Sequence, residues 1–287
     1  YAQFVVNGDA YANAQCGYYT LTDTTNQTGS VWNQNLIDLT NSFDFSFQVF
    51  LGCSNSGADG ITFGLQPVDT IIGGIGGGMG LFGVTPSFGV YIDTYSNKAP
   101  QNDPVQDHLS INSNGDTYHD GGADDLAGPI VIPEIEDCAW HDIQVVWNST
   151  ALTFDVSLDG TLYLTYTGDI VKKIFKGNPN VFFGITGATG DLYNHQQVRA
   201  VENLEAKYQN ELNQTKIEKK NLELQNLQLI TSKKEKETQV WIVGIIGLLI
   251  ITALFFLRYR LIQSKKSILK EAQLNAAEKE QEIFVGK

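Results

Sequence analysis

The segment YIDTYSNKAPQNDPVQDHLSI (residues 91–111) gathers side chains that suit a metal ion, namely Asp93, Asn97, Asp103, Asp107 and His108. Carboxylates this close together repel one another unless a positive charge lies between them. Calcium prefers about six to eight oxygen ligands from carboxylates, carbonyls and water, and the imidazole nitrogen of His108 suits a transition-metal ion. The segment is therefore either a solvated acidic loop or a loop that binds a cation.

The elements that must position this loop are predicted to be β-strands. Phe43, Phe45, Phe47 and Val49 alternate with polar residues, which is the pattern of a half-buried strand. Apolar residues alternate again over 152–158 and 162–166, on either side of Asp159-Gly160, which predicts a hairpin with a two-residue turn. Many short strands and abundant glycine predict an all-β antiparallel sandwich over residues 1–200.

Charge and cysteine content limit the possible functions of this part. Residues 1–200 carry 5 of the 19 basic and 21 of the 32 acidic residues, and such an acidic surface excludes a nucleic-acid partner. No two cysteines have the C-x-x-C spacing of a zinc site. The chain begins at Tyr1, which indicates a processed and exported protein. In an exported domain we expect a Cys16–Cys53 disulfide and an unpaired Cys138, the alternative being three buried free thiols.

The composition changes after the predicted sandwich. Residues 191–243 contain neither Gly nor Pro, and Glu, Lys, Gln, Asn and Leu dominate 202–236, which predicts a long exposed helix. The apolar residues recur at irregular spacings, so residues 201–238 are either a coiled-coil stalk that pairs two chains or a single solvated helix.

A membrane span is predicted directly after the stalk. Residues 240–257, VWIVGIIGLLIITALFFL, carry no charge and are apolar on all sides, so we expect a transmembrane helix over 239–257. Trp241 and Tyr259 lie near its ends, as interfacial aromatic residues do, and Arg258, Arg260 and Lys265 follow it. The basic residues favour a cytoplasmic tail over residues 258–287 and a predicted sandwich outside the cytoplasm.

Four motifs, in this order, resemble those of the legume-type (L-type) lectins. They are GADGITFGLQP (57–67), GGGMGLFG (76–83), VYIDTYSN with DPVQDH (90–108) and FFGITGATG (182–190), and they resemble bacterial members more than plant seed lectins. The resemblance covers residues 1–200. It implies a concanavalin-like jelly-roll sandwich that binds carbohydrate in a calcium-dependent manner.

The resemblance also implies roles for individual residues. Asp59 would accept hydrogen bonds from sugar hydroxyls, and the Ala58–Asp59 peptide bond would be cis. The ring of Tyr95 would stack on the sugar, while Asn97 would bridge sugar and calcium. The implied carbohydrate-binding residues are Asp59, Gly77, Gly78, Tyr95, Asn97, Asp191 and Leu192, and the implied metal ligands are Asp93, Tyr95, Asn97, Asp103 and His108.

Two departures from the family pattern bear on the metals. Many plant lectins carry Glu two residues before the first metal-binding Asp, where it binds a second, transition-metal ion. Here that residue is Tyr91, so we expect the second site to be weak or empty. The interval from Asn97 to Asp103 is also long, which makes Asp107 a possible substitute ligand.

Three classes of function compete. The resemblance favours a membrane-anchored lectin for glycan recognition or adhesion. A sandwich glycosidase needs two carboxylates flanking the scissile bond, and the strand at 91–95 offers only Asp93, so we expect no enzyme activity. The stalk, span and basic tail also resemble the membrane linkers of bacterial sensors, so the alternative is the glycan-sensing part of a signalling receptor.

Overall fold

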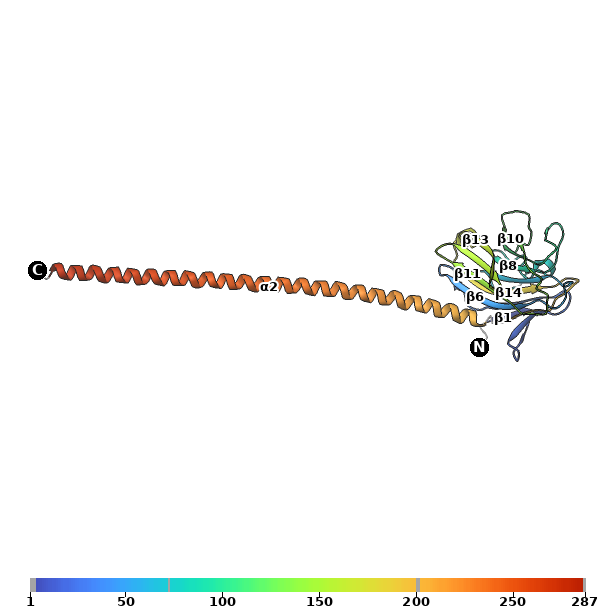
Figure 1. Ribbon diagram of the computed structural model, residues 1–287, viewed down its shortest axis with the longest axis horizontal. Coiled ribbons are helices and arrows are strands. Elements are labelled where there is room, and N and C mark those ends of the chain that lie inside the picture. The colour runs from blue at the N-terminus through green and yellow to red at the C-terminus, as the bar shows by residue number, and fades with distance from the viewer. Residues whose placement is uncertain (1–3, 72, 200–201, 286–287) are drawn as a thin grey trace. The chain divides into compact units, whose positions relative to one another are not determined.

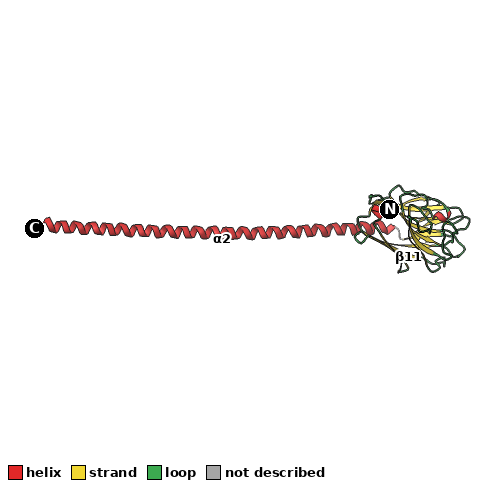
Figure 2. Cartoon of the chain, turned by 90° about the horizontal axis from the view of Figure 1, so that it is seen from above, coloured by secondary structure: helices red, strands yellow, loops and turns green. Residues whose placement is uncertain are grey.

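The computed structural model describes residues 4–71, 73–199 and 202–285, and it confirms an all-β antiparallel sandwich followed by one long helix (Figures 1 and 2). The first layer contains β1 (Phe4–Gly8), β4 (Thr28–Asn33), β5 (Ile37–Asp38), β7 (Gly60–Gln66), β8 (Phe88–Asp93), β9 (His108–Ser113), β10 (Asp125–Val131) and β14 (Asn180–Ala188). The second contains β2 (Tyr11–Asn13), β3 (Tyr18–Thr22), β6 (Phe43–Phe50), β11 (His141–Asn148), β12 (Thr153–Leu158), β13 (Thr161–Thr167) and β15 (Gln196–Arg199). The helices are η1 (Gly76–Gly78), α1 (Ile170–Lys173) and α2 (Glu202–Val285).

The core lies between the two layers and follows from the alternation in the sequence. Phe43, Phe45, Phe47 and Val49 of β6 are each at most 3% exposed, whereas the residues between them are half-buried or exposed. Side chains of a strand alternate between its two faces, so the apolar set of β6 points inward. The 152–166 hairpin is confirmed as β12 and β13, with Asp159 and Gly160 both at positive φ in the turn.

The first sheet is buried on both faces at its centre. Every residue of β7 and β8 is buried. A second apolar cluster covers the outer face of the sheet, and it consists of Trp32, Met79, Leu81, Val84 and Tyr91. Met79 and Leu81 come from the glycine-rich segment that follows η1, so this segment is packed against the sheet. The loop is thereby held next to the ends of β7 and β8.

Strand register brings the ends of four chain segments into one row. Adjacent strands follow the order β14, β7, β8, β9, and all these pairs are antiparallel. Ala188 pairs with Gly60, Gly60 pairs with Asp93, and Asp93 pairs with His108. Residues distant in the sequence are therefore neighbours at one edge of the sheet.

The start of α2 belongs to the same compact unit as the sandwich, which extends from Tyr1 to Gln214. Tyr208 is 3% exposed and its ring lies against Phe45. The backbone N–H of Asp38 donates a 3.0 Å hydrogen bond to the Tyr208 hydroxyl. The helix thus contributes an anchoring aromatic residue to the core, which its irregular apolar spacing did not indicate.

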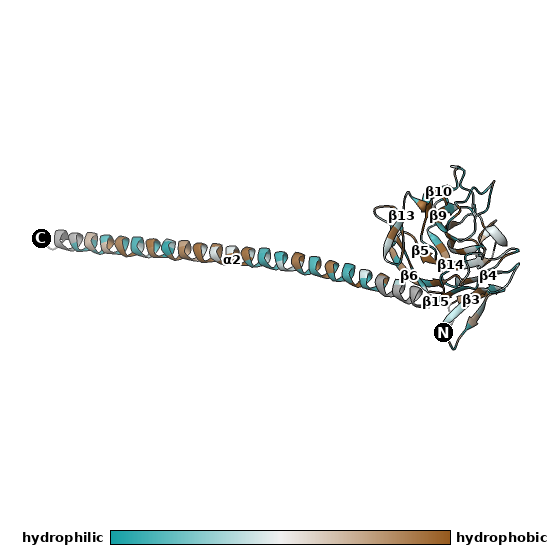
Figure 3. Ribbon diagram, turned by 45° about the vertical axis from the view of Figure 1, so that its right-hand side comes forward, coloured by the Kyte–Doolittle hydropathy of each residue, from teal (hydrophilic) through white to brown (hydrophobic). Residues whose placement is uncertain are grey.

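The second compact unit, Thr215–Lys287, consists of the remainder of α2 in the described residues. One stretch of this helix is long and apolar enough to cross a membrane, and none of its most apolar window is buried. Figure 3 shows apolar residues recurring along α2. The expected stalk at 201–238, its pairing with a second chain and the span at 239–257 stay predictions.

The expected Cys16–Cys53 disulfide is wrong. Cys53 is bonded to Cys138, and Cys16 is an exposed free cysteine. Cys53 follows β6 and Cys138 precedes β11, and these two strands are antiparallel neighbours with Val49 paired to His141. The Cys138 N–H also donates to the Gly52 carbonyl. The two cysteines therefore meet where their strands end, whereas Cys16 lies in the turn between β2 and β3.

This pairing predicts unequal effects of two matched substitutions. Cys138→Ser should lower the free energy of unfolding by about 4 kcal/mol, because the disulfide closes a long loop of the unfolded chain. Cys16→Ser should leave it within about 0.5 kcal/mol of the parent, because that side chain is exposed. Denaturant unfolding of the full chain in detergent measures both, and equal effects of the two substitutions would contradict the observed pairing.

Candidate functional site

The row of strand ends carries the centre of the site. The peptide bond between Ala58 and Asp59 is cis, as the resemblance to the L-type lectins implies, and Asp59 leads into β7. The Asp59 N–H donates to the Ala188 carbonyl at 3.1 Å, and the Asp59 carbonyl accepts from the Thr94 N–H at 3.0 Å. Asp59 is thus fixed by backbone bonds to the two strands beside it. Asp59 as a whole residue is 4% exposed.

A hollow of about 270 Å³ opens above Asp59. Its lining includes most residues that the sequence assigned to carbohydrate binding, and the full set is Ala58, Asp59, Gly76, Gly77, Tyr95, Asn97, Gly190, Asp191 and Leu192. Tyr95 is 38% exposed, so its ring is open to a ligand. Gly78 does not line the hollow, because it lies next to Phe82, where a Cβ would come within 2.6 Å of the Phe82 side chain.

Gly77 is a close neighbour of Asn97 across this hollow. A Cβ on Gly77 would lie 3.0 Å from Asn97 Nδ2, tighter than nearly all real contacts. The missing side chain therefore leaves room for the amide of Asn97 beside the backbone of η1. Asn97 Nδ2 is buried and has no hydrogen-bond partner, and neither has Asp59 Oδ2. Buried polar atoms are normally paired, so these two atoms are available to a ligand in the hollow.

The metal-loop residues are held by short backbone bonds. Asp93 Oδ1 accepts from the Tyr95 N–H at 2.8 Å, and Asp103 Oδ2 accepts from the Asn97 N–H at 2.8 Å. His108 Nε2 lies 3.8 Å from Asp93 Oδ2 and 4.0 Å from Asp103 Oδ1. All five predicted metal-ligating residues therefore lie in one loop and at its two ends, with Asp93, Asp103 and His108 facing one another.

A nearby positive charge would stabilise the buried carboxylates of this group. Burial, with the neighbouring Asp103, raises the pKa of Asp93 well above its usual range. Burial likewise raises the pKa of Asp59 to about 7 and that of Asp103 to about 6. None of these three carboxylates forms an ion pair with Lys or Arg within the described residues. A bound cation would offset their repulsion and return the carboxylates to their ionised form, so the donor set fits calcium.

His119 is a member of the site that sequence reasoning missed. Its Nε2 atom lies 3.6 Å from Asp103 Oδ1, and Asp103, His108 and His119 offer three ligand atoms within 4.8 Å of one another. Burial lowers the pKa of His108 to about 4 and also lowers that of His119, so both rings are neutral, as metal ligands must be. His119 is in the loop between β9 and β10. This loop carries no motif that would have predicted that the ring lies beside Asp103.

The structure also shows where the side chains of Tyr91 and Asp107 lie. The Tyr91 ring is packed in the apolar cluster on the outer face, and its hydroxyl has no hydrogen-bond partner. Asp107 was a possible substitute ligand for the calcium loop. Instead its carboxylate clusters with Glu134 and Glu136, and its Oδ2 accepts from the Ile135 N–H at 2.9 Å.

A second hollow, of about 410 Å³, shares Asp191 and Leu192 with the first. The other residues that line it are Thr25, Gly52, Cys53, Ser54, Ser56, Tyr193, Asn194 and His195. The rings of Tyr193 and His195 meet edge to face at 5.8 Å. Asp191 and Leu192 therefore form a wall between two adjacent depressions, one of which the sequence did not predict.

Solved structures similar to this chain include lectins. The basic winged bean lectin with Tn-antigen has a TM-score of 0.58 and 19% identity, and the match covers 69% of this chain and 90% of that one. The Ca²⁺-bound exoplasmic/lumenal domain of VIP36 has a TM-score of 0.55 and 20% identity, covering 68% of this chain and 80% of that one. At these identities the likeness shows the fold.

Curated relatives match by sequence over shorter parts of much longer proteins. The pesticidal crystal protein Cry22Aa of Bacillus thuringiensis is 34% identical over 102 residues, which is 35% of this chain and 14% of that protein. The serine-rich adhesin for platelets of Staphylococcus aureus is 28% identical over 216 residues, which is 67% of this chain and 9% of that protein. This chain thus spans less than a sixth of the length of either relative.

The model of one protein family matches the sandwich as a whole. It is the legume lectin β-barrel domain, and it covers residues 1–202, more than half of the chain. This match agrees with the cis Ala58–Asp59 bond and with the hollow that Asp59, Asn97 and Gly77 surround. The chain belongs to the legume lectin domain family, whose fold supports carbohydrate binding.

Proposed function

We propose that this protein is a calcium-dependent carbohydrate-binding protein anchored in a membrane by α2, with its lectin domain outside the cytoplasm. The observation that carries the proposal is the hollow in which the carboxylate of Asp59, the amide of Asn97 and the backbone of Gly77 converge. Two buried atoms there, Asp59 Oδ2 and Asn97 Nδ2, lack protein partners. A sugar supplies vicinal hydroxyls, which both donate and accept hydrogen bonds.

Each residue has a separate task in this proposal. Asp59 accepts hydrogen bonds from sugar hydroxyls, while Asn97 Nδ2 donates one. The exposed ring of Tyr95 stacks on the apolar face of the sugar, and Leu192 and Asp191 also line the hollow. We expect a single-site affinity of about millimolar, or roughly −4 kcal/mol. The adjacent second hollow supports an oligosaccharide ligand rather than a single sugar.

Calcium would be held by Asp93, Asn97, Asp103 and the Tyr95 carbonyl, with water completing the shell. A bound ion supplies positive charge that balances the carboxylates and fixes the loop. The ion-fixed loop presents Asn97 and Tyr95 to the hollow. The calcium-bound VIP36 neighbour supports this assignment as an analogy of fold.

A neighbouring transition-metal site would use Asp93, Asp103 and His108. His119 adds a nitrogen donor to this site. Its imidazole is neutral, so it supplies a ligand but not the negative charge of the Glu that Tyr91 replaces. Two neighbouring dications need that negative charge to offset their mutual repulsion. We therefore propose that this second site is weaker than the calcium site.

The anchor and the relatives favour a role in adhesion. The apolar part of α2 provides a membrane span, and the basic residues after it favour a cytoplasmic C-terminus. The similarity to part of an adhesin supports a role in attachment. Pairing through the stalk would raise weak single-site affinity by effective concentration. The alternative, a glycan sensor, is favoured by the unbroken course of α2 from Glu202 to Val285, which could transmit a signal.

Asp59→Ala should abolish sugar binding and leave the sandwich folded. Each lost charge-assisted hydrogen bond costs about 1.5–3 kcal/mol, which is enough to erase a millimolar interaction. A glycan array of monosaccharides and oligosaccharides, probed with the full chain in detergent, measures the loss. Asp120→Ala, at an exposed Asp outside the hollow, is the matched control and should bind as the parent does. Unchanged binding by Asp59→Ala would refute the role of this residue.

Removal of calcium should abolish sugar binding, and calcium alone should restore it. Without the ion, the side-chain oxygen of Asn97 has no cation to orient its amide toward the hollow. Retention on a glycan column is compared before chelation, after chelation and after addition of calcium or manganese. Elemental analysis of the purified protein then reports the native ions. Binding that survives exhaustive chelation, or stoichiometric manganese beside calcium, would contradict the proposal.

The calcium-free protein should become less stable as the pH rises from about 4.5 to 8. Burial raises the pKa values of Asp59 to about 7 and of Asp103 to about 6. The folded state therefore holds protons that the unfolded state has released, and stability falls as pH rises through the folded-state values. His108, whose pKa is lowered to about 4, acts in the opposite sense below about pH 6.5, but the raised carboxylates outnumber the lowered histidines.

Thermal unfolding in chelator across this pH range measures the effect. Excess calcium should remove most of the slope, because it binds the ionised carboxylates of the folded state. Stability in chelator that rises steadily with pH over the same interval would contradict this account of the site.

A further inference from the structure

A second group of carboxylates lies outside the calcium loop. Asp107, Glu134 and Glu136 offer three oxygen atoms within 4.8 Å of one another. Asp107 directly precedes β9, and the two glutamates lie on the segment before β11. Asp107 is 5% exposed and Glu136 is 3% exposed, while Glu134 is open to solvent. The cluster therefore combines two buried acids with one acid at its mouth.

Glu136 is the unusual member of this cluster. Both of its carboxylate oxygens are buried and accept no hydrogen bond of good geometry, although the side chains of Asn194 and Thr94 lie close enough to act against the rise of its pKa. By contrast, Asp107 Oδ2 accepts from the Ile135 N–H at 2.9 Å, and Glu134 Oε1 accepts from the Glu136 N–H at 3.1 Å. An ionised carboxylate with no donor is costly to bury. One of its oxygens lies within 4.8 Å of a carboxylate oxygen of each of the other two acids, which is the arrangement of an empty ligand set.

No basic side chain among the described residues neutralises the negative charge of this cluster. Within the described residues, none of the three acids forms an ion pair with Lys, Arg or His. Burial raises the pKa of Glu136 to about 8, and Asp107 and Glu134 also contribute to the rise. A bound divalent cation would supply the positive charge that the described residues do not.

We propose that Asp107, Glu134 and Glu136 bind a divalent cation, calcium by the chemistry of the ligands, at a site separate from the sugar-associated metal loop. Hard carboxylate oxygens without nitrogen or sulfur donors suit calcium. Backbone carbonyls and water complete its shell. The inference does not rest on carbohydrate binding, because it concerns a different set of oxygens.

The site would brace the back of the sugar-binding region. A Cβ on Gly57 would lie 2.6 Å from Glu136 Oε1 and 1.3 Å from Asn194 Oδ1, so Glu136 and Asn194 both lie against the backbone that precedes Ala58-Asp59. The Asn194 N–H donates to the Ala58 carbonyl, and its Nδ2 donates to Thr94 Oγ1. An ion on Glu136 thus stabilises the contact between this segment and the Asp59 turn.

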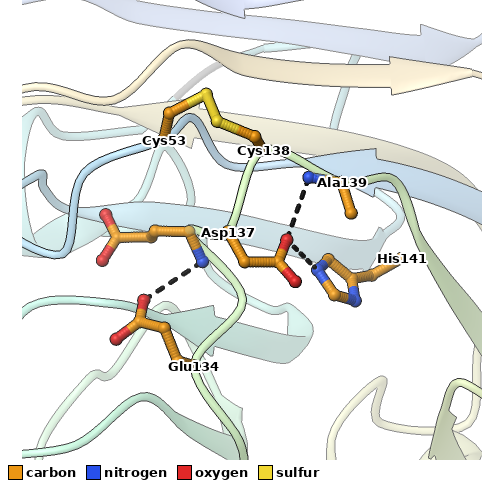
Figure 4. The surroundings of a disulfide bond; sticks show 7 residues. Cys53, Glu134, Asp137, Cys138, Ala139 and His141 are labelled. Carbon is orange, nitrogen blue, oxygen red and sulfur yellow. Dashed lines mark hydrogen bonds and ion pairs between the residues drawn. A yellow bond between two sulfur atoms is a disulfide. The ribbon is translucent and has the colours of Figure 1, made fainter.

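The disulfide holds the same segment from the other end. Figure 4 shows Glu134 and Cys138 on one stretch of chain, with Cys138 bonded to Cys53. Cys53 lies in the loop that leads from β6 to Gly57. The loop before Asp59 is therefore fixed covalently at Cys53 and would be fixed by the cation near Gly57.

Calcium stoichiometry of the full chain in detergent tests the proposal. Equilibrium dialysis against calcium, with elemental analysis, is applied to the parent, to Glu136→Gln and to Asp103→Asn. The matched control is Glu218→Gln, the same change on an exposed residue of α2. We expect Glu136→Gln to bind one calcium fewer than the parent and Glu218→Gln to bind the same number. Asp103→Asn should lose the ion of the metal loop and keep the ion bound at Glu136.

The outcomes separate this site from the sugar-associated one. If Asp103→Asn loses no ion but Glu136→Gln loses one, the cluster site stands and the calcium loop fails. If Glu136→Gln keeps the parent's stoichiometry and affinity, the cluster site is wrong. In chelator, Glu136→Gln should unfold at a temperature no lower than the parent, because it removes a buried unpaired carboxylate.

Glu134→Gln provides the second variant if Glu136→Gln does not fold. Glu134 is exposed, so its substitution should leave the fold intact, and it should weaken the cluster's calcium affinity roughly tenfold or more by removing an anionic ligand. Unchanged affinity in Glu134→Gln would also overturn the proposal.

Discussion

The repulsion between buried carboxylates at one edge of the first sheet is the constraint on which the site depends. Asp93 and Asp103 lie in one loop, Asp59 lies beside it, and none of the three is paired with Lys or Arg in the part of the chain that the structure describes. A sandwich that buries acids in this way is most stable when a cation lies among them. The calcium dependence that we propose would thus follow from where the strands place the acids.

The register of the strands positions these acids. The pairs Ala188–Gly60, Gly60–Asp93 and Asp93–His108 align four segments across adjacent strands. The glycine-rich segment after η1 packs Met79 and Leu81 into the outer apolar cluster, so the backbone of Gly77 stays close to Asn97. The same apolar packing that stabilises the sheet therefore holds the polar groups of the hollow in place. The Cys53–Cys138 bond adds a covalent constraint behind it.

Much of the fold and site could be predicted from the sequence because their signals are local. The alternation over Phe43–Val49 and the turn at Asp159-Gly160 predicted the strands, and the resemblance of the GADG motif to that of the L-type lectins implied the cis bond before Asp59. His119, Glu134 and Glu136 were missed because they reach their clusters only through the pairing of β9 with β10 and the course of the segment before β11. The partner of Cys53 was misjudged for the same reason, since the adjacency of β6 and β11 is a property of topology and has no local pattern.

The most direct test of the central claim is a crystal structure of the protein grown with calcium and the best-bound glycan from the array, with anomalous scattering used to locate ions. We predict an anomalous peak among Asp93, Asn97, Asp103 and the Tyr95 carbonyl, and sugar hydroxyls within hydrogen-bond distance of Asp59 and Asn97. A glycan bound at another face, or a bound glycan at Asp59 with no ion in the loop, would contradict the account.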